Sequence, residues 1–152
     1  MFFVGIDVGK RHHEACIIDS LGQIIGKTLR FTNTQSGGQK LLEWLRKVDK
    51  DLASTCIAME ATGHYWLALH SFRRKNGLTV RVINPIQSDS FRNLYIRQTK
   101  NDTKDAFIIA EVLRFGRYTT TELATEDIIA LRQLCRFRFS MVDTIADLKR
   151  KV

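Results

Sequence analysis

The chain has 152 residues, enough for one globular domain with a core, and its hydrophobic fraction of 44% is ordinary for a soluble fold. Its net charge is +8, from 24 Lys and Arg against 16 Asp and Glu, and so basic a balance suggests a polyanionic partner such as nucleic acid. No apolar stretch approaches the ~20 residues of a membrane-spanning helix, and the apolar start lacks the basic residues of a signal peptide, so we expect a cytoplasmic protein.

Three strands joined by short connections open the chain. Residues 2–7 are apolar, β-branched or aromatic and end on Asp7, and residues 14–19 and 23–31 have a similar strand-like composition on either side of a glycine turn. Connections this short predict a meander of three antiparallel strands.

Helix and strand patterns alternate after this meander. Apolar residues recur at helical spacing around Leu41 and Leu45, and a later apolar run ends on Glu60. Asn84 and Pro85 fit a helix N-cap followed by proline at the first helical position. The elements expected are, in order, a helix to about residue 50, a strand at 54–60, a helix at 64–76, a strand at 78–83, a helix at 86–93, a helix at 102–115 and a helix from about 125 to 152. This alternation predicts an α/β fold, with a mixed five-stranded sheet and helices on both faces.

The last helix carries an apolar repeat with a period of seven residues. Its members are Leu131, Leu134, Met141, Ile145, Leu148 and Val152. Arg138 interrupts the repeat, which is still running at the last residue without a cap, so we expect a chain cut inside a long helix that begins a coiled coil. We therefore divide the chain into a domain at residues 1–120 and the start of a long helix at residues 121–152.

Three cysteines, Cys16, Cys56 and Cys135, stand in apolar patterns without the spacing of metal ligands. Their number is odd, which argues against a disulfide framework. They predict buried, reduced thiols in a reducing compartment.

Four acidic residues occupy positions that suit a metal site. Asp7 and Glu60 each end a strand, and in an open α/β sheet functional sites gather at strand ends near the switch in strand order. Asp102 and Asp105 are three residues apart on a helix, so their side chains share one face. Four convergent carboxylates would repel one another without a cation, and oxygen ligands suit Mg²⁺ or Mn²⁺. Two such ions can activate a hydroxyl nucleophile and stabilise the leaving oxygen of a phosphodiester.

Each acid also has an ordinary structural explanation. Asp7 can end a strand before a turn, and Asp102 and Asp105 can compensate the dipole at the start of their helix. Glu60 is harder to explain in this way because it terminates an apolar strand. The prediction of a metal site therefore depends on the combination of acidic residues at two strand ends and on one helix face.

Basic residues near the acids are candidates for contacts with nucleic-acid phosphates. These candidates are Lys10, Arg97, Lys100 and Lys104. His12 and His13 follow the first strand, and we interpret them as polar residues of the turn rather than as ligands.

The acids lie within three longer segments, at residues 5–10 (GIDVGK), 59–65 (MEATGHY) and 99–106 (TKNDTKDA). In order and spacing, these segments resemble the DEDD transposases of the insertion-sequence 110 and Piv DNA-invertase family. Asn84-Pro85 also matches the turn that the family has after the strand that follows the second segment. The family usually has Thr where Asn101 stands, a departure that leaves the acids untouched.

The resemblance implies an RNase H-like (RuvC-like) fold, with Asp7, Glu60, Asp102 and Asp105 as the acidic tetrad of an Mg²⁺-dependent DNA recombinase. It also implies a C-terminal domain with a serine nucleophile, joined through a coiled coil, and in the insertion-sequence branch guidance by a structured bridge RNA. A chain without that serine-bearing domain is expected to be incompetent for full recombination by itself.

Three other functions share parts of this pattern. A sugar-kinase or actin-like ATPase also begins with a strand ending in Asp-x-Gly and a meander, but it needs a second phosphate-binding glycine-rich loop. A stand-alone Holliday-junction resolvase would share the fold and the acids, but not the terminal heptads together with the three segments. A non-catalytic nucleic-acid-binding module would not require an intact set of four acids.

Overall fold

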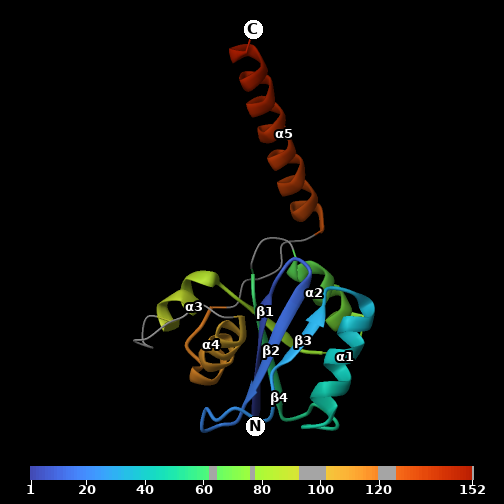
Figure 1. Ribbon diagram of the computed structural model, residues 1–152, viewed down its shortest axis with the longest axis vertical. Helices are drawn as coiled ribbons and strands as arrows, with labels where there is room; N and C mark the ends of the chain where they lie inside the picture. The colour runs from blue at the N-terminus through green and yellow to red at the C-terminus, as the bar shows by residue number, and fades with distance from the viewer. Residues whose placement is uncertain (62–64, 76–77, 93–101, 120–125, 152) are drawn as a thin grey trace. The chain divides into compact units, whose positions relative to one another are not determined.

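The computed structural model describes residues 1–61, 65–75, 78–92, 102–119 and 126–151. The chain forms two compact units, Met1–Thr121 and Glu122–Val152. The first unit is a sheet flanked by helices, and the second contains the long helix α5 (Figure 1).

A five-stranded mixed sheet forms the centre of the first unit. Its strands are β1 (Phe2–Val8), β2 (His12–Ile18), β3 (Leu29–Thr32), β4 (Thr55–Glu60) and β5 (Val80–Ile83). They lie in the order β3-β2-β1-β4-β5, with β1, β2 and β3 antiparallel and with β1, β4 and β5 parallel. The predicted mixed five-stranded sheet is confirmed.

The third strand is shorter than the sequence predicts. The segment at residues 23–31 pairs only through a bridge at Ile24 before β3 begins at Leu29. Asp19 Oδ1 accepts hydrogen bonds of 2.9 Å from two amides of the preceding turn, and Gly26 has a φ of +72°. This turn chemistry and the left-handed glycine interrupt the extended backbone, so the ladder resumes only after them.

Helices cover both faces of the sheet, as predicted. They are α1 (Gln35–Arg46), α2 (Trp66–Lys75), α3 (Pro85–Arg92) and α4 (Asp102–Phe115). Figure 1 shows α1 and α2 on one side of the sheet and α3 and α4 on the other. The hydrophobic core divides in the same way, with one cluster toward α1 and α2 and two smaller clusters toward α4.

Side chains of β1 alternate between these two core layers. Val4 and Ile6 pack in the cluster that contains Leu41 of α1, whereas Gly5 faces α4. A Cβ on Gly5 would lie 2.0 Å from the carbonyl oxygen of Ala106, so the absence of a side chain allows α4 to rest directly on β1. This contact fixes the position of α4 along β1.

Side chains cap the N-termini of two helices. Thr34 Oγ1 accepts a hydrogen bond of 3.2 Å from the Gly37 amide and caps α1. Asn84 Oδ1 accepts one of 3.0 Å from the Ile86 amide, and Pro85 is the first residue of α3, which confirms the predicted N-cap and proline pair.

The second unit contains α5 (Glu126–Arg150). Its apolar side chains are exposed, and Cys135 is exposed among them. The prediction of buried thiols is therefore correct for Cys16 and wrong for Cys135, because apolar neighbours in the sequence do not bury a residue on a helix with an open surface. None of the helices in the described ranges is long and apolar enough to cross a membrane.

Candidate active site

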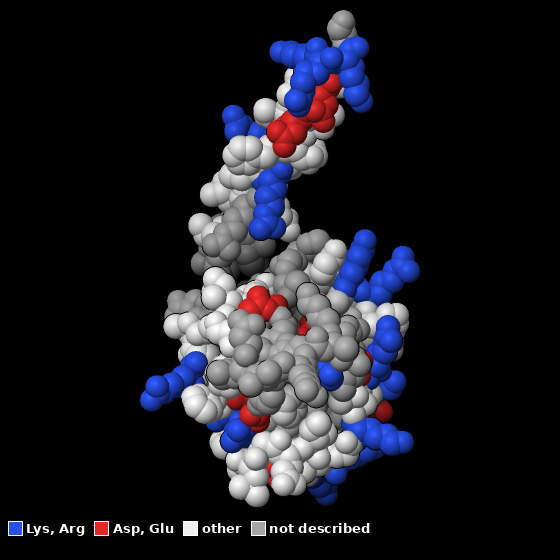
Figure 2. Space-filling view, turned by 60° about the vertical axis from the view of Figure 1, so that its left-hand side comes forward, with Lys and Arg blue, Asp and Glu red and all other residues white. Residues whose placement is uncertain are grey.

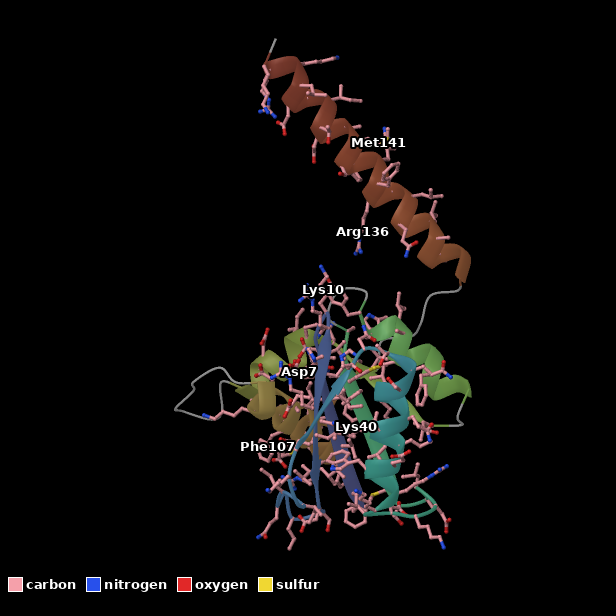
Figure 3. All side chains as sticks on the ribbon, turned by 45° about the vertical axis from the view of Figure 1, so that its right-hand side comes forward. Asp7, Lys10, Lys40, Phe107, Arg136 and Met141 are labelled. Carbon is pink, nitrogen blue, oxygen red and sulfur yellow. The ribbon has the colours of Figure 1, made fainter. Side chains whose placement is uncertain are left out.

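Asp7 and Glu60 lie side by side at one end of the sheet. β1 and β4 are parallel and Ile6 pairs with Met59, so Asp7 and Glu60 follow one residue further along each strand. Neighbouring residues of paired strands point to the same face, which here is the face covered by α3 and α4. Both side chains are half-buried, and Figure 3 labels Asp7 toward the end of β1.

A third acid shares this face. Asp7 pairs across the hairpin with Glu14 of β2, and side chains of such a pair lie about 5 Å apart at the Cβ atoms. Glu14 Oε1 accepts a hydrogen bond of 3.0 Å from Thr28 Oγ1. Glu14 is not among the acids that the sequence motifs indicate. The hairpin register could have indicated it, because Val8 pairs with His13 and the next pair along the hairpin is Asp7 with Glu14.

The fourth element of the site is the start of α4. Asp105 is half-buried and directly precedes Ala106, whose carbonyl oxygen lies over Gly5. Gly5 and Asp7 are on the same face of β1, so Asp105 belongs to the helix that covers the face that carries Asp7. Asp102 is the first residue of α4, and its side chain lies outside the described part of the chain.

Glu60 is held by a residue of α3. Ser88 is fully buried, and its Oγ donates a hydrogen bond of 2.8 Å to Glu60 Oε2. Ser88 Oγ also lies 2.9 Å from the carbonyl oxygen of Pro85. No sequence signal singles out Ser88, because the contact with Glu60 joins residues that are 28 positions apart.

The basic candidates are only partly within the described residues. Lys10 is exposed in the turn between β1 and β2, beyond Asp7 in Figure 3, and Lys104 is exposed in the first turn of α4. Arg97 and Lys100 lie outside the described residues. Figure 2, which looks toward the side of α3 and α4, shows acidic side chains at the upper surface of the first unit and basic side chains around its margins.

The His13 side chain lies on the opposite face of the sheet from the acids. The prediction that His12 and His13 are turn residues is wrong, because both belong to β2. Because the turn is tight, with the Gly9 amide 3.1 Å from the His12 carbonyl oxygen, β2 already begins at His12. The His13 side chain is buried against Phe31, with their ring centroids 5.1 Å apart, beside a cavity of about 500 Å³. Neither ring nitrogen has a hydrogen-bond partner among the described groups. Burial lowers the pKa of His13 because it penalises the charged imidazole.

The acids on this face of the sheet are all oxygen donors. Carboxylate oxygens, such as those of Asp7, Glu60 and Asp105, suit Mg²⁺ or Mn²⁺ better than a softer metal. Among the described side chains, no group of three or more His, Cys, Asp or Glu residues is close enough together to hold a metal ion. The side chain of Asp102 is not part of that set.

Comparison with known proteins places these features in a family. Residues 4–152 match the family described as Transposase, the DEDD transposases of the IS110 type. The chain is 28% identical over 114 residues to the pilin gene-inverting protein of Moraxella bovis, covering 75% of this chain and 34% of that protein. It is 30% identical over 131 residues to the mini-circle putative transposase for IS117 of Streptomyces coelicolor, covering 84% of this chain and 30% of that protein. The chain thus spans about a third of the length of these curated relatives.

A solved structure shares the fold of the first unit. RuvC of Thermus thermophilus in complex with a Holliday junction substrate aligns with a TM-score of 0.54 at 15% identity, covering 80% of this chain and 99% of that one. The structure of T. thermophilus RuvC gives the same TM-score at 14% identity. The likeness confirms the predicted RuvC-like, RNase H-like fold.

Proposed function

The chain belongs to the IS110-type family of DEDD transposases, and from that membership we propose that it is the N-terminal catalytic domain of a DNA transposase or recombinase. The reaction would be metal-dependent cleavage of a DNA phosphodiester followed by strand transfer. The observation that carries the proposal is the placement of Asp7 and Glu60 at the ends of two adjacent parallel strands, each one residue beyond the Ile6–Met59 pair, on the face that α4 covers. The RuvC-like fold supports it at the level of architecture.

We assign the metal ligands to Asp7, Glu60, Asp102 and Asp105. Mg²⁺ or Mn²⁺ bound there would polarise the phosphodiester and lower the pKa of an attacking water or hydroxyl. The chain's own contribution is to hold like charges near one another on rigid elements, two on neighbouring strands and two on one helix. Such charges repel, so the unliganded site favours a cation.

Positive side chains near the acids would hold the DNA backbone. Lys10 and Lys104 are exposed within the described residues and are the first candidates for phosphate contacts. We extend the proposal to Arg97 and Lys100 because they stand in the same basic stretch before α4. The net charge of +8 supports a polyanionic partner.

The curated relatives are about two to three times as long as this chain, and the remaining partners are proposed for a longer protein of that kind. We propose a downstream serine-bearing domain, guidance by a structured RNA, and a homo-oligomer joined through a coiled coil that begins in α5. The exposed apolar side chains of α5 support the last of these. The cysteines of the described chain are free thiols, which suits a reducing cytoplasm.

Calorimetric titration with Mn²⁺ in the absence of nucleotide tests the metal site. The wild-type chain should bind Mn²⁺, and Asp7→Asn should weaken that binding at least tenfold because a first ligand loses its charge. Ser90→Ala is the control, because it removes an exposed hydroxyl of α3 that donates to the Ile86 carbonyl oxygen, and it should bind Mn²⁺ as the wild type does. Binding that appears only with ATP would favour a kinase-like ATPase, and no binding by the wild-type chain would contradict the metal site.

The alternative is a stand-alone Holliday-junction resolvase, which the coverage of 99% of the RuvC chain favours. The family match extends through α5 to residue 152 and favours the transposase. Cleavage assays on four-way junctions and on linear DNA, with Mg²⁺ and Asp7→Asn as the control, separate the two. Efficient resolution of junctions by this chain alone would support the resolvase.

A further inference from the structure

The junction between β5 and α3 has no role in the function proposed so far. Its backbone is nevertheless closely fixed, because Asn84 Oδ1 accepts from the Ile86 amide at 3.0 Å and the Asn84 carbonyl accepts from the Gln87 amide at 2.9 Å. Pro85 restricts the backbone at the first residue of the helix. The first turn of α3 is therefore held in one conformation.

This turn stands directly against the end of β4. Glu60 pairs with Ile83 in β5, and the Ala61 amide donates a hydrogen bond of 3.2 Å to the Ile83 carbonyl oxygen. α3 begins two residues after Ile83, so its first turn rises beside Glu60. Ser88 is the residue of that turn whose hydroxyl meets the carboxylate, and it is fully buried.

The hydroxyl of Ser88 has one proton and two acceptors within reach. Glu60 Oε2 is 2.8 Å away and the Pro85 carbonyl oxygen is 2.9 Å away. An ionised carboxylate is the stronger acceptor, and a carbonyl in the first turn of a helix already receives an amide hydrogen from the next turn. The proton therefore goes to Glu60 when Glu60 is charged, and it fixes one of the two carboxylate oxygens.

We propose that Ser88 is a positioning residue for Glu60, and that the Asn84-Pro85 junction serves to hold Ser88 in place. The inference rests on the proposed metal site, in which Glu60 is a ligand. With one oxygen held by Ser88, the Glu60 carboxylate presents the other in a fixed direction. Outer residues that orient metal ligands typically contribute about 10–100-fold to metal affinity.

Magnesium and calcium should respond differently to the loss of this hydrogen bond. Mg²⁺ demands near-ideal octahedral geometry, whereas Ca²⁺ accepts variable coordination. Ser88→Ala should therefore weaken Mg²⁺ binding by about tenfold and Ca²⁺ binding by clearly less. A purely structural role for Ser88 would lower stability without separating the two ions.

The chain supplies a matched control on the same helix. Ser90 is exposed, and its Oγ donates to the Ile86 carbonyl at 2.8 Å. Ser90→Ala removes an equivalent hydroxyl from α3 without touching Glu60, so it should leave both affinities unchanged. Ser88→Cys keeps nearly the volume of the buried side chain but donates weakly, and it should share the loss of Ser88→Ala.

Calorimetric titrations with Mg²⁺ and with Ca²⁺ test the proposal. They compare the wild-type chain with Ser88→Ala, Ser88→Cys, Ser90→Ala, Glu60→Gln and the double variant Ser88→Ala/Glu60→Gln. In the Glu60→Gln background, Ser88→Ala should cause no further loss, because the group that it positions is gone. Wild-type Mg²⁺ affinity in Ser88→Ala or Ser88→Cys, or additive losses in the double variant, would overturn the positioning role. If the positioning role were overturned but Glu60→Gln still weakened Mg²⁺ binding, the proposed metal site would stand. If the wild-type chain bound neither Mg²⁺ nor Mn²⁺, the metal site and the role of Ser88 would both be wrong.

Discussion

Gly5 of β1 lies directly beneath Ala106 of α4, where an added Cβ would stand 2.0 Å from the Ala106 carbonyl oxygen and 2.4 Å from the Ala110 amide nitrogen. These neighbours are backbone atoms, so no side-chain rotation can make room. We predict that Gly5→Ala lowers the free energy of unfolding by about 2–3 kcal/mol, as overpacking does in well-packed cores. Urea unfolding measures this change.

Gly26 is the control for this substitution, because nothing lies within 4 Å of a Cβ placed there. Its φ of +72° is tolerated by asparagine, so Gly26→Asn should lower the stability by less than about 1 kcal/mol. Equal losses for the two variants would contradict the close approach of α4 to Gly5. Since Asp105 precedes Ala106, Gly5→Ala should also weaken Mn²⁺ binding, whereas Gly26→Asn should not.

Replacing Lys104 tests the proposed DNA-binding surface. Lys104 is exposed in the first turn of α4, next to Asp105. If it contacts a phosphate, Lys104→Ala should weaken binding to all DNA sequences alike and lower the slope of log K against log salt by about one unit. Lys40→Ala is the control, because Lys40 lies on α1, on the opposite face of the sheet (Figure 3). An unchanged salt slope in Lys104→Ala would exclude this residue from the interface.

Burial of His13 predicts a dependence of stability on pH. Its pKa is below the ordinary value of 6.5 because burial penalises the charged imidazole. Below that pH the unfolded chain therefore binds a proton that the folded chain does not, so this residue's contribution to stability falls as the pH falls. His13→Leu should lose less stability than the wild type between about pH 7.5 and about pH 5.5, measured by urea unfolding.

The exposed neighbour His12 provides the comparison for that experiment. His12→Gln should keep most of the wild-type loss on acidification, since it leaves the buried imidazole in place. If His13→Leu and the wild type lost equal stability over this range, groups other than His13 would account for the acid sensitivity.

The parts of the fold that follow from local patterns could be predicted from the sequence. The apolar runs that end on Asp7 and Glu60 became adjacent strands, and the helix predicted at residues 102–115 begins and ends at those residues. The predicted strand at residues 23–31 failed because Asp19 and Gly26 impose turn geometry inside an apolar segment.

The surroundings of the acids depend on tertiary contacts that have no local pattern. Glu14 joins Asp7 through the register of a hairpin, and Ser88 reaches Glu60 across two parallel strands and a helix start. His13 looks like a turn residue in sequence, and only the tight turn before it places it in a buried strand position. Motifs therefore indicated candidate ligands, while the residues that hold them required the structure.

The apolar repeat of α5 predicts self-association. Leu131, Leu134, Met141, Ile145 and Leu148 are all between 49% and 66% exposed, and Val142 beside them is 48% exposed. Burying such a surface is favourable by about 25 cal/mol per Å², and a second copy offers the same seven-residue pattern. We expect sedimentation equilibrium to show a dimer that forms as the protein concentration rises.

Substitutions on and off the repeat distinguish this dimer from non-specific association. Met141→Lys combined with Ile145→Lys should keep the chain monomeric at concentrations where the wild type dimerises, because each copy would bring charges into the contact. Ser140→Lys adds one positive charge away from the repeat and should leave the dimer intact. Arg138 interrupts the repeat at a core position, so Arg138→Leu should tighten the dimer. A monomeric wild-type chain at high concentration, or an Arg138→Leu variant with unchanged association, would show that α5 does not pair in this register, and the carboxylate site would be unaffected.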